Sequence, residues 1–254
     1  MPFPVEIGHG NATISAHLLL ETLAFMIGFR YFLYLRKKGT DTLPDDHRVQ
    51  LLIAATFGAF AGSRLVGSLE DPAGIFRSAH PFLYFYAHKS IVGGLLGGLL
   101  CVEWTKQMLH VTKSSGDLMT FPLILAMIIG RVGCFSSGVY EDTYGLETGF
   151  FTGLDLGDGK LRHPVALYEA SFLALLWVVL HQWRKRVIFQ DGMLFQIFMT
   201  AYFLFRFGLE FLKPRVEVVA GLGTLQLFCL AGLFYYRHTL YRIFFQPKAL
   251  TVYG

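Results

Sequence analysis

Seven apolar runs of membrane-spanning length constrain the fold of this chain more than any other feature. A transmembrane helix needs about 20 mostly apolar residues. Runs of this kind cover residues 14–35, 50–69, 90–109, 117–136, 164–183, 191–212 and 219–236. Charged residues make up only 16% of the chain, against about 25% in soluble domains. The sequence therefore predicts an all-α integral membrane protein with seven transmembrane helices, forming one transmembrane domain over residues 1–254.

Basic residues between the runs predict the orientation. With the N-terminus outside, twelve Lys and Arg residues lie inside and six lie outside. The inside set is Arg36, Lys37, Lys38, Arg48, Lys106, Lys113, Arg184, Lys185, Arg186, Arg237, Arg242 and Lys248. Because cytoplasmic loops carry the excess of positive charge, we expect the N-terminus outside and the C-terminus in the cytoplasm. No basic residue precedes the first run, so we interpret that run as a retained helix and not as a cleaved signal peptide.

The loop at about 137–163 is the longest segment on the predicted outer side. It is rich in Gly, Asp and Thr. Loops longer than about 12–15 residues are often functional or disordered. We expect this one to form a short hairpin or arm on the outer face of the membrane domain.

Other partner classes leave no trace in the sequence. The three cysteines lie in separate apolar runs, which argues against a disulfide framework. No motif suggests a metal, a nucleotide, another cofactor or a nucleic acid as a ligand. The aromatic and basic tail at 235–248 is typical of an amphipathic helix on the cytoplasmic interface.

Ionisable side chains gather at one depth of the predicted membrane. Five apolar runs carry them toward their outer ends: His17, Glu21, Arg64, Arg131, His163, Glu169, Arg206 and Glu210. An arginine in the lipid core costs at least about 2.5–3.5 kcal/mol on insertion scales, so it needs a partner or an anionic ligand. These positions predict a polar site in the outer leaflet.

Two interpretations of this polar site remain open. The residues could form structural ion pairs between helices, since Arg206 and Glu210 are one helical turn apart. However, three arginines at one depth favour an anionic ligand such as a phospholipid phosphate. The glycines are open to the same two interpretations. Gly93 and Gly94 fit close helix packing but could also line a headgroup cavity. Gly130 and Gly133 leave space around Arg131.

Six short segments form an ordered set of motifs along nearly the whole chain. They are GSRL at 62–65, IVGGLLGG at 91–98, GRVGCFSSG at 130–138, HPVALYEA at 163–170, FRFGLEFLKPR at 205–215 and GLGTLQ at 221–226. Together they resemble the motifs of the bacterial prolipoprotein diacylglyceryl transferases. The resemblance implies a seven-span enzyme of the bacterial inner membrane with its active site on the outer-leaflet side.

Such enzymes move the diacylglyceryl group of phosphatidylglycerol to the lipobox cysteine thiol of a preprolipoprotein signal peptide, and they release glycerol phosphate. By resemblance, Arg131 and Arg206 would hold the headgroup phosphate, and Glu210 would orient Arg206. Arg64, Gly93, Gly94, Gly130, Gly133 and Cys134 match motif positions that would contribute to substrate binding, as do His163, Tyr168 and Glu169.

The chain departs from the family pattern on the side expected to activate the acceptor. Within the motif at 130–138, Cys134 and Ser137 replace asparagines, and Val139 just after it replaces a glutamate. Val92 replaces a histidine. A tyrosine of the first span is missing, and His17 and Glu21 occupy its region. A histidine that titrates near neutral pH suits the removal of a thiol proton. The general base could therefore be His17, Glu21 or His88.

Cys134 itself has two interpretations. It could be a thiolate favoured by the nearby Arg131 and carry a covalent lipid. The alternative, which we favour, is that Cys134 is a small apolar substitute for asparagine. The same departures leave two other functions open: transfer from the same donor to a different acceptor, or non-catalytic phospholipid binding.

The predicted orientation can be tested by cysteine labelling. A cysteine placed in the loop at 146–160 should react with a membrane-impermeant thiol reagent in intact cells, and one placed at 38–46 should not. The reverse pattern would overturn the outer-leaflet assignment.

Overall fold

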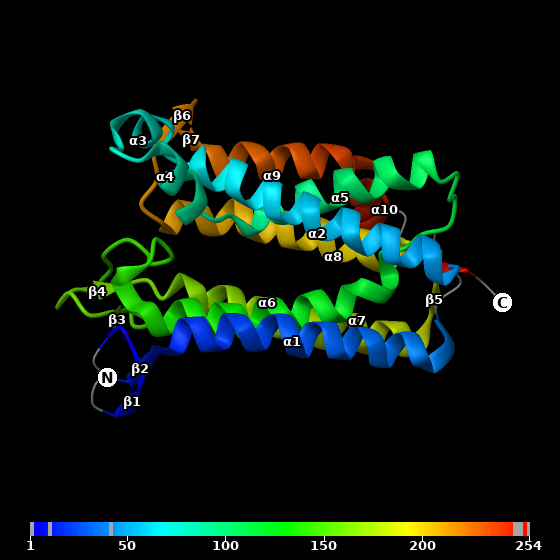
Figure 1. Cartoon of the computed structure of the whole chain (residues 1–254), viewed down its shortest axis with the longest axis horizontal. Coiled ribbons are helices and arrows are strands. Elements are labelled where there is room, and N and C mark those ends of the chain that lie inside the picture. Colours follow the sequence, from blue (N-terminus) through cyan, green and yellow to red (C-terminus); the bar gives the residue numbers. More distant parts are fainter. Residues whose placement is uncertain (1–2, 10–11, 41–42, 246–250, 253–254) are drawn as a thin grey trace.

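Helices form most of the protein in this computed structural model, which describes residues 3–9, 12–40, 43–245 and 251–252. The main helices run along the long axis of the molecule (Figure 1). They are α1 (Ala16–Leu35), α2 (Asp45–Ser68), α5 (Ile91–Met108), α6 (Asp117–Ser137), α7 (Val165–Arg186), α8 (Met193–Leu209) and α9 (Thr224–Tyr235).

Shorter elements lie at the helix ends. The helical ones are η1 (Arg36–Thr40), α3 (Pro72–Arg77), α4 (Pro81–Ala87), η2 (Gly138–Tyr140), η3 (Glu210–Leu212) and α10 (Arg237–Phe245). The strands pair antiparallel in twos: β1 (Glu6–His9) with β2 (Ala12–Ser15), β3 (Leu154–Asp155) with β4 (Leu161–Arg162), β5 (Ile188–Phe189) with β8 (Thr251–Val252), and β6 (Glu217–Val219) with β7 (Leu222–Gly223).

The helices identify a multi-pass membrane protein. Within the part of the chain that the structure describes, five helices are long and apolar enough to cross a membrane, and a sixth is reached when α4 and α5 are joined across their 88° bend. Helix α9 has 12 residues, so it extends only about 18 Å at 1.5 Å per residue. A hydrocarbon core is about 30 Å thick. The predicted count of seven spans therefore stays a prediction.

The two ends of the helix bundle differ in structure. Strands β1–β4, β6 and β7 lie at one end together with α3 and α4, whereas β5 and α10 lie at the other (Figure 1). Helix α10 covers most of the predicted tail helix, but Lys248 of that tail lies outside the described residues. The ionisable residues of the candidate site lie at the end with the longer connections.

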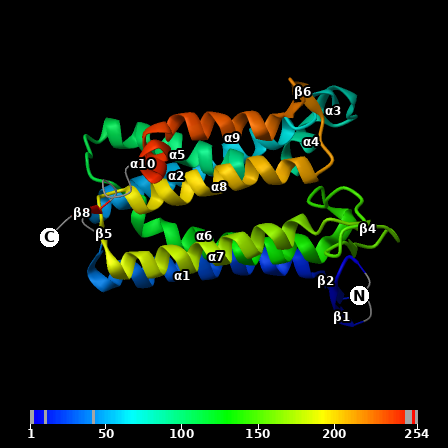
Figure 2. The ribbon, with the colours of Figure 1, turned by 180° about the vertical axis from the view of Figure 1, so that it is seen from behind.

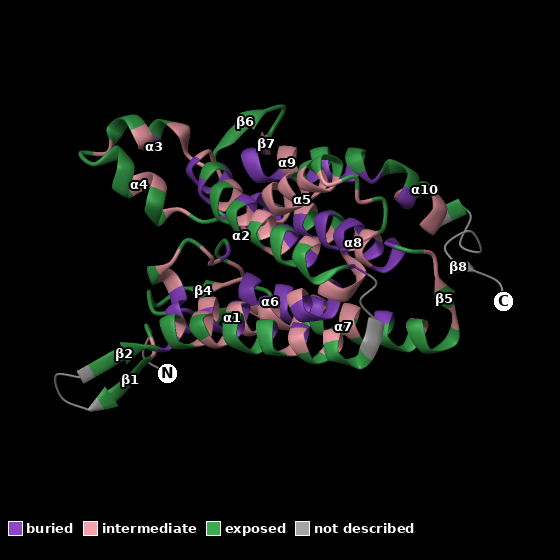
Figure 3. Ribbon diagram, turned by 45° about the vertical axis from the view of Figure 1, so that its right-hand side comes forward, coloured by how far each residue is buried: buried purple, intermediate pink, exposed green. Residues whose placement is uncertain are grey.

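Helix α8 links two groups of helices. Helices α1, α6 and α7 form one group, and α2, α5 and α9 form the other; α8 contacts α6, α7 and α9 (Figure 2). Phe198, Tyr202 and Phe203 of α8 are fully buried. The surfaces facing outward from the bundle are largely exposed, as expected of helices that contact lipid (Figure 3). Arg206, at the end of α8, is thereby placed between the two groups.

Glycines bring α2 and α5 into backbone contact. A Cβ atom added at Gly97 would lie 2.2 Å from the Gly58 carbonyl oxygen, and one added at Gly93 would lie 2.3 Å from the Gly62 carbonyl oxygen. No side chain fits at such distances, so these glycines are required for close packing. Gly94 also faces α2, where an added Cβ would meet Ala59 at 3.5 Å.

Substitution at this interface should separate packing from helix propensity. We expect Gly97→Ala to destabilise the protein by about 1–3 kcal/mol, because overpacking forces the helices apart. Gly94→Ala is the matched control: its Cβ has room, and alanine favours a helix by about 1 kcal/mol over glycine. Thermal unfolding in detergent measures both, and equal midpoints for the two variants would contradict this account of the interface.

Candidate active site

A buried carboxylate lies between the two arginines of the predicted phosphate site. Glu169 on α7 pairs with Arg131 on α6 at 2.8 Å (Oε1 to Nε) and approaches Arg206 on α8 at 4.0 Å (Oε2 to Nε). The Tyr202 hydroxyl donates a 2.8 Å hydrogen bond to Glu169 Oε1. Glu169 is only 2% exposed. One carboxylate thus joins three helices at the same depth.

Arg206 has a second acidic partner on its own helix turn. Glu210 Oε2 lies 2.8 Å from Arg206 Nη1, and both side chains are buried. The charges alternate along the series Arg131, Glu169, Arg206 and Glu210. Alternation matters because a buried charge without a partner is strongly unfavourable. Glu210 is thus the nearer acidic partner of Arg206, and its orienting role stays a prediction.

A small cavity opens beside these ion pairs, and its volume of about 180 Å³ includes space open to solvent. Its lining residues are Arg131, Thr143, Val165, Ala166, Glu169, Arg206, Leu209 and Lys213. Lys213 follows η3 and is itself buried, which lowers its pKa. Three basic side chains and one carboxylate therefore line this space. An excess of positive charge suits an anionic group.

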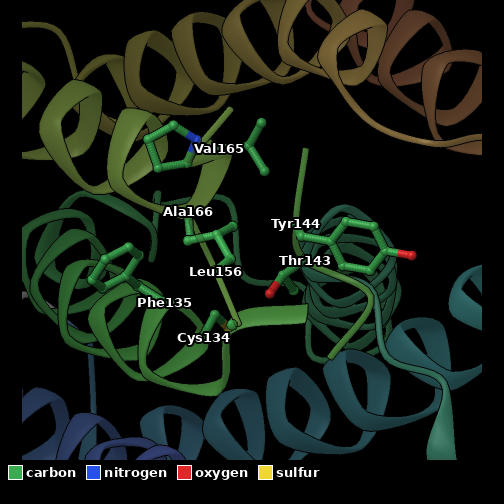
Figure 4. Close-up of a pocket in the computed structure, with 9 residues that line it drawn as sticks. Cys134, Phe135, Thr143, Tyr144, Leu156, Val165 and Ala166 are labelled. Carbon is green, nitrogen blue, oxygen red and sulfur yellow. The ribbon is translucent and has the colours of Figure 1, made fainter. Parts of the chain in front are cut away.

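A second cavity of about 190 Å³ adjoins the first, since Thr143, Val165 and Ala166 line both. Figure 4 shows Cys134, Phe135 and Leu156 in its wall together with Thr143 and Tyr144. Arg131 Nη1 donates to Cys134 Sγ at 3.8 Å. The sulfur of Cys134 therefore has a charged neighbour, and both interpretations of this residue stay predictions.

His17 on α1 brings further ionisable groups to this region. Its Nδ1 lies 3.3 Å from Glu141 Oε2, and its Nε2 lies 3.6 Å from Glu21 Oε2. Lys89 holds Glu21 with contacts of 2.9 and 3.1 Å. Close approach of α1 to α6 depends on Gly133, where an added Cβ would lie 3.1 Å from Leu20 Cβ and 3.5 Å from His17 Nδ1.

Comparison with known proteins decides the family. The sequence model of the prolipoprotein diacylglyceryl transferase family matches residues 4–240. The chain belongs to the prolipoprotein diacylglyceryl transferase family. Three similar proteins, each named phosphatidylglycerol–prolipoprotein diacylglyceryl transferase, come from Treponema denticola, Campylobacter hominis and Glaesserella parasuis.

The similarity extends over most of each chain. The Treponema protein is 26% identical over 82% of this chain and 77% of its own length. The Campylobacter protein is 29% identical over 83% and 78%, and the Glaesserella protein is 26% identical over 93% and 94%. These relatives confirm the family resemblance carried by the six motifs.

Arg64, Gly93 and Gly94 are among the motif residues of this diacylglyceryl transferase family member that do not line either described cavity. The Arg64 guanidinium donates to the Tyr86 carbonyl and lies over the rings of Phe60 and Tyr86, at 5.3 and 4.6 Å from the ring centres. Gly93 and Gly94 pack against α2. The expected headgroup contact of these three residues stays a prediction, and the third basic residue of the first cavity is Lys213.

Two further motif residues organise the segment at 137–163. His163 Nδ1 lies 3.2 Å from the Tyr168 hydroxyl, which also contacts Thr152. The Leu146 amide donates to the Leu212 carbonyl, and the His163 amide donates to the Leu146 carbonyl. His163 and Tyr168 therefore hold the strand–loop segment near η3, while Gly130 leaves open space where a Cβ would point.

The sequence interpretation did not identify several residues of this site. Lys213 lies just beyond the predicted sixth span, Thr143 lies in a loop, and Tyr202 carries no charge. Lys89 entered the sequence analysis only as one of the six basic residues predicted outside. His88, the third candidate base, has Asp142 Oδ2 at 4.0 Å from its Nε2. Lys89 comes just before α5, at the predicted outer end of that span, so its position could have suggested it as a site residue. Its pairing with Glu21 is visible only in the folded chain.

Removal of the central carboxylate should be costly. We expect Glu169→Gln to destabilise the protein by about 3–5 kcal/mol, because two buried guanidiniums lose their shared partner. Glu147→Gln is the control, since Glu147 pairs with Lys160 and Arg162 at the surface and such pairs contribute about 0–1 kcal/mol. Thermal unfolding in detergent compares them, and a Glu169→Gln midpoint equal to that of the control would refute the central role of this pair.

Proposed function

We propose that this protein transfers the diacylglyceryl group of phosphatidylglycerol to the lipobox cysteine of a preprolipoprotein. The cavity lined by Arg131, Arg206 and Lys213 carries this proposal, because it presents three buried cations to one small space. The relatives named for this reaction support the choice of donor and acceptor. Glycerol phosphate is the second product.

On the donor side, the arginines hold the headgroup phosphate. The carbon–oxygen bond between the glyceryl group and the phosphate breaks, and negative charge develops on the departing oxygen. Cations already in position stabilise this charge at little reorganisation cost. Glu169 and Glu210 fix the two guanidinium planes, and the N–H groups turned toward the cavity remain to bind phosphate. Gly130 leaves open space beside Arg131, and Gly133 lets α1 approach α6 closely.

On the acceptor side, His17 and Glu21 serve the incoming thiol. A thiol with a pKa near 8.5 is mostly protonated at neutral pH, so transfer needs help in removing the proton. His17 adjoins Cys134, and Cys134 adjoins Arg131, so this pair is near the donor phosphate. Glu21, held by Lys89, orients His17.

For the membrane, we propose seven crossings, with α9 and the turn into α10 completing the last. The N-terminus is outside, the C-terminus is cytoplasmic, and the site faces the outer leaflet of the bacterial inner membrane. Residues 1–254 form a single transmembrane domain. The arm at 137–163 covers the site, because Thr143, Tyr144 and Leu156 line the second cavity.

A direct assay tests the function. Purified protein, phosphatidylglycerol in detergent and a lipobox peptide should release glycerol phosphate and yield a thioether-linked peptide by mass spectrometry. Because Val92 and Cys134 depart from the family pattern, a different acceptor is the second candidate. Release of glycerol phosphate that needs another acceptor would favour it, and tight lipid binding without turnover would favour a non-catalytic protein.

Substitution of the arginines tests the donor site. We expect Arg131→Ala and Arg206→Ala to abolish transfer, since each removes a charge-assisted contact of about 1.5–3 kcal/mol that strengthens in the transition state. Arg131→Lys should also lose most activity, because an ammonium does not reproduce the planar fork. Arg77→Ala, at an exposed pair with Asp71, is the control. Near-normal turnover in both alanine variants would exclude the headgroup assignment.

Substitution of the acceptor pair gives a different pattern. His17→Ala and Glu21→Ala should slow transfer while phosphatidylglycerol binding remains, because neither residue lines the phosphate cavity. Binding and rate are measured side by side, with His88→Ala for comparison. Wild-type rates in both variants, with slowed transfer in His88→Ala, would move the acceptor role to His88.

A further inference from the structure

Three side chains that are distant in sequence converge beside the phosphate cavity. They are His17 on α1, Cys134 on α6 and Glu141 just after η2. One ligand atom from each, a ring nitrogen, the sulfur and a carboxylate oxygen, lies within 4.8 Å of the other two. All three side chains are half-buried. No sequence spacing could show this cluster, and we expected no metal site from the sequence.

Two atoms of the cluster face each other away from solvent. They are His17 Nδ1 and Glu141 Oε2, which lie 3.3 Å apart. Two ligands about 2.0–2.1 Å from a tetrahedral zinc ion lie about 3.3–3.4 Å from one another. The separation of these two atoms therefore matches that of two ligands on one ion.

The groups behind His17 match the surroundings of a metal-bound histidine. Its second nitrogen, Nε2, faces Glu21 at 3.6 Å, and Lys89 holds that carboxylate from the far side at 2.9 Å. Metal-bound histidines almost always present their other ring nitrogen to a carboxylate, a carbonyl or water, which fixes the ring. Glu21 thus has a place in the cluster without being a ligand.

We propose that His17, Cys134 and Glu141 bind a zinc ion. Nitrogen, thiolate and carboxylate ligands are those that zinc takes in proteins, whereas Mg²⁺ and Ca²⁺ are bound by oxygen. The Arg131 guanidinium donates to Cys134 Sγ from the side of the phosphate cavity. Three protein ligands leave a fourth position open, as in catalytic zinc sites.

This inference rests on the proposed function, in which the open position of the zinc ion binds the acceptor thiol. The acceptor cysteine binds there through sulfur: its S–H bond breaks, a sulfur–zinc bond forms, and the proton leaves to water. A thiol that coordinates zinc is deprotonated. The sulfur then attacks the glyceryl carbon bonded to phosphate, forming the C–S bond. The C–O bond breaks, its electron pair stays on the phosphate oxygen, and the neutral thioether leaves the metal.

The position of the cluster suits that step. Cys134 contacts Arg131, and Arg131 lines the phosphate cavity, so one residue adjoins both the zinc ligands and the donor headgroup. The family histidine expected at Val92 is missing. A zinc ion supplies the thiolate that this histidine would otherwise have to produce. The alternative is a protonated His17 paired with Glu141 and no metal.

Metal analysis of the full-length protein in detergent tests the site. After incubation with zinc and removal of free ion, the wild-type protein should retain one zinc per chain by mass spectrometry. His17→Ala, Cys134→Ser and Glu141→Gln should lose it, and Glu21→Gln should weaken zinc binding about 10–100-fold. Cobalt in place of zinc should give a thiolate-to-metal absorption band that Cys134→Ser abolishes. Cys101→Ser, which changes a cysteine on α5, is the matched control and should keep both signals.

The same samples separate this proposal from the proposed function. Chelator-treated protein should lose transfer to the lipobox peptide at least tenfold and recover it with zinc, while still binding phosphatidylglycerol. Transfer at the full rate with no bound metal would overturn the zinc site and leave the function intact. Zinc bound through these three residues without transfer to any lipobox peptide would support the site and contradict the function. A wild-type protein that retains no zinc or cobalt would leave the protonated His17–Glu141 pair as the account of the cluster.

Discussion

The buried position of Glu169 between Arg131 and Arg206 is the constraint on which the rest of the structure depends. Two guanidiniums from different helices would repel each other and lack solvation at this depth, so neither α6 nor α8 could keep its place without a shared anion. Glu169 supplies that anion from a third helix, α7, and Tyr202 completes its hydrogen bonding. The helices that hold the site are therefore fixed by the charges that form it. We therefore expect a phosphate that enters the proposed site to meet cations whose orientation is already set.

The sequence predicts this part of the molecule well because its signal is local. Long apolar runs give the helices, and Arg206 with Glu210 is visible as a pair one turn apart. An arginine inside an apolar run, such as Arg131, can hardly be a surface residue. What the sequence does not show is which carboxylate Arg131 meets, because helix rotation and tilt depend on packing. Lys213 was missed for a related reason: it follows the last helical turn and looks like an ordinary interfacial lysine until the 3₁₀ turn η3 places it against the cavity.

Long-range clusters are less accessible to such reasoning. His17, Cys134 and Glu141 lie on different elements, and their meeting depends on how close α1 can come to α6. Gly133 decides that distance, since any side chain there would meet Leu20 and His17. The glycines of α2 and α5 act in the same way on the other group of helices. Gly93 and Gly94 match a family motif, yet their contacts are with α2. A motif residue can therefore be required for helix packing without contacting the substrate.

Cys134 shows why a single substitution can change the chemistry available to a site. An asparagine at this position would offer a neutral amide to Arg131 and to His17. A cysteine offers a sulfur that can carry negative charge, and it stands between a guanidinium and an imidazole. In the proposed reaction Arg131 therefore adjoins both sides of the site, because it lines the cavity proposed for the phosphate and its Nη1 donates to the Cys134 sulfur.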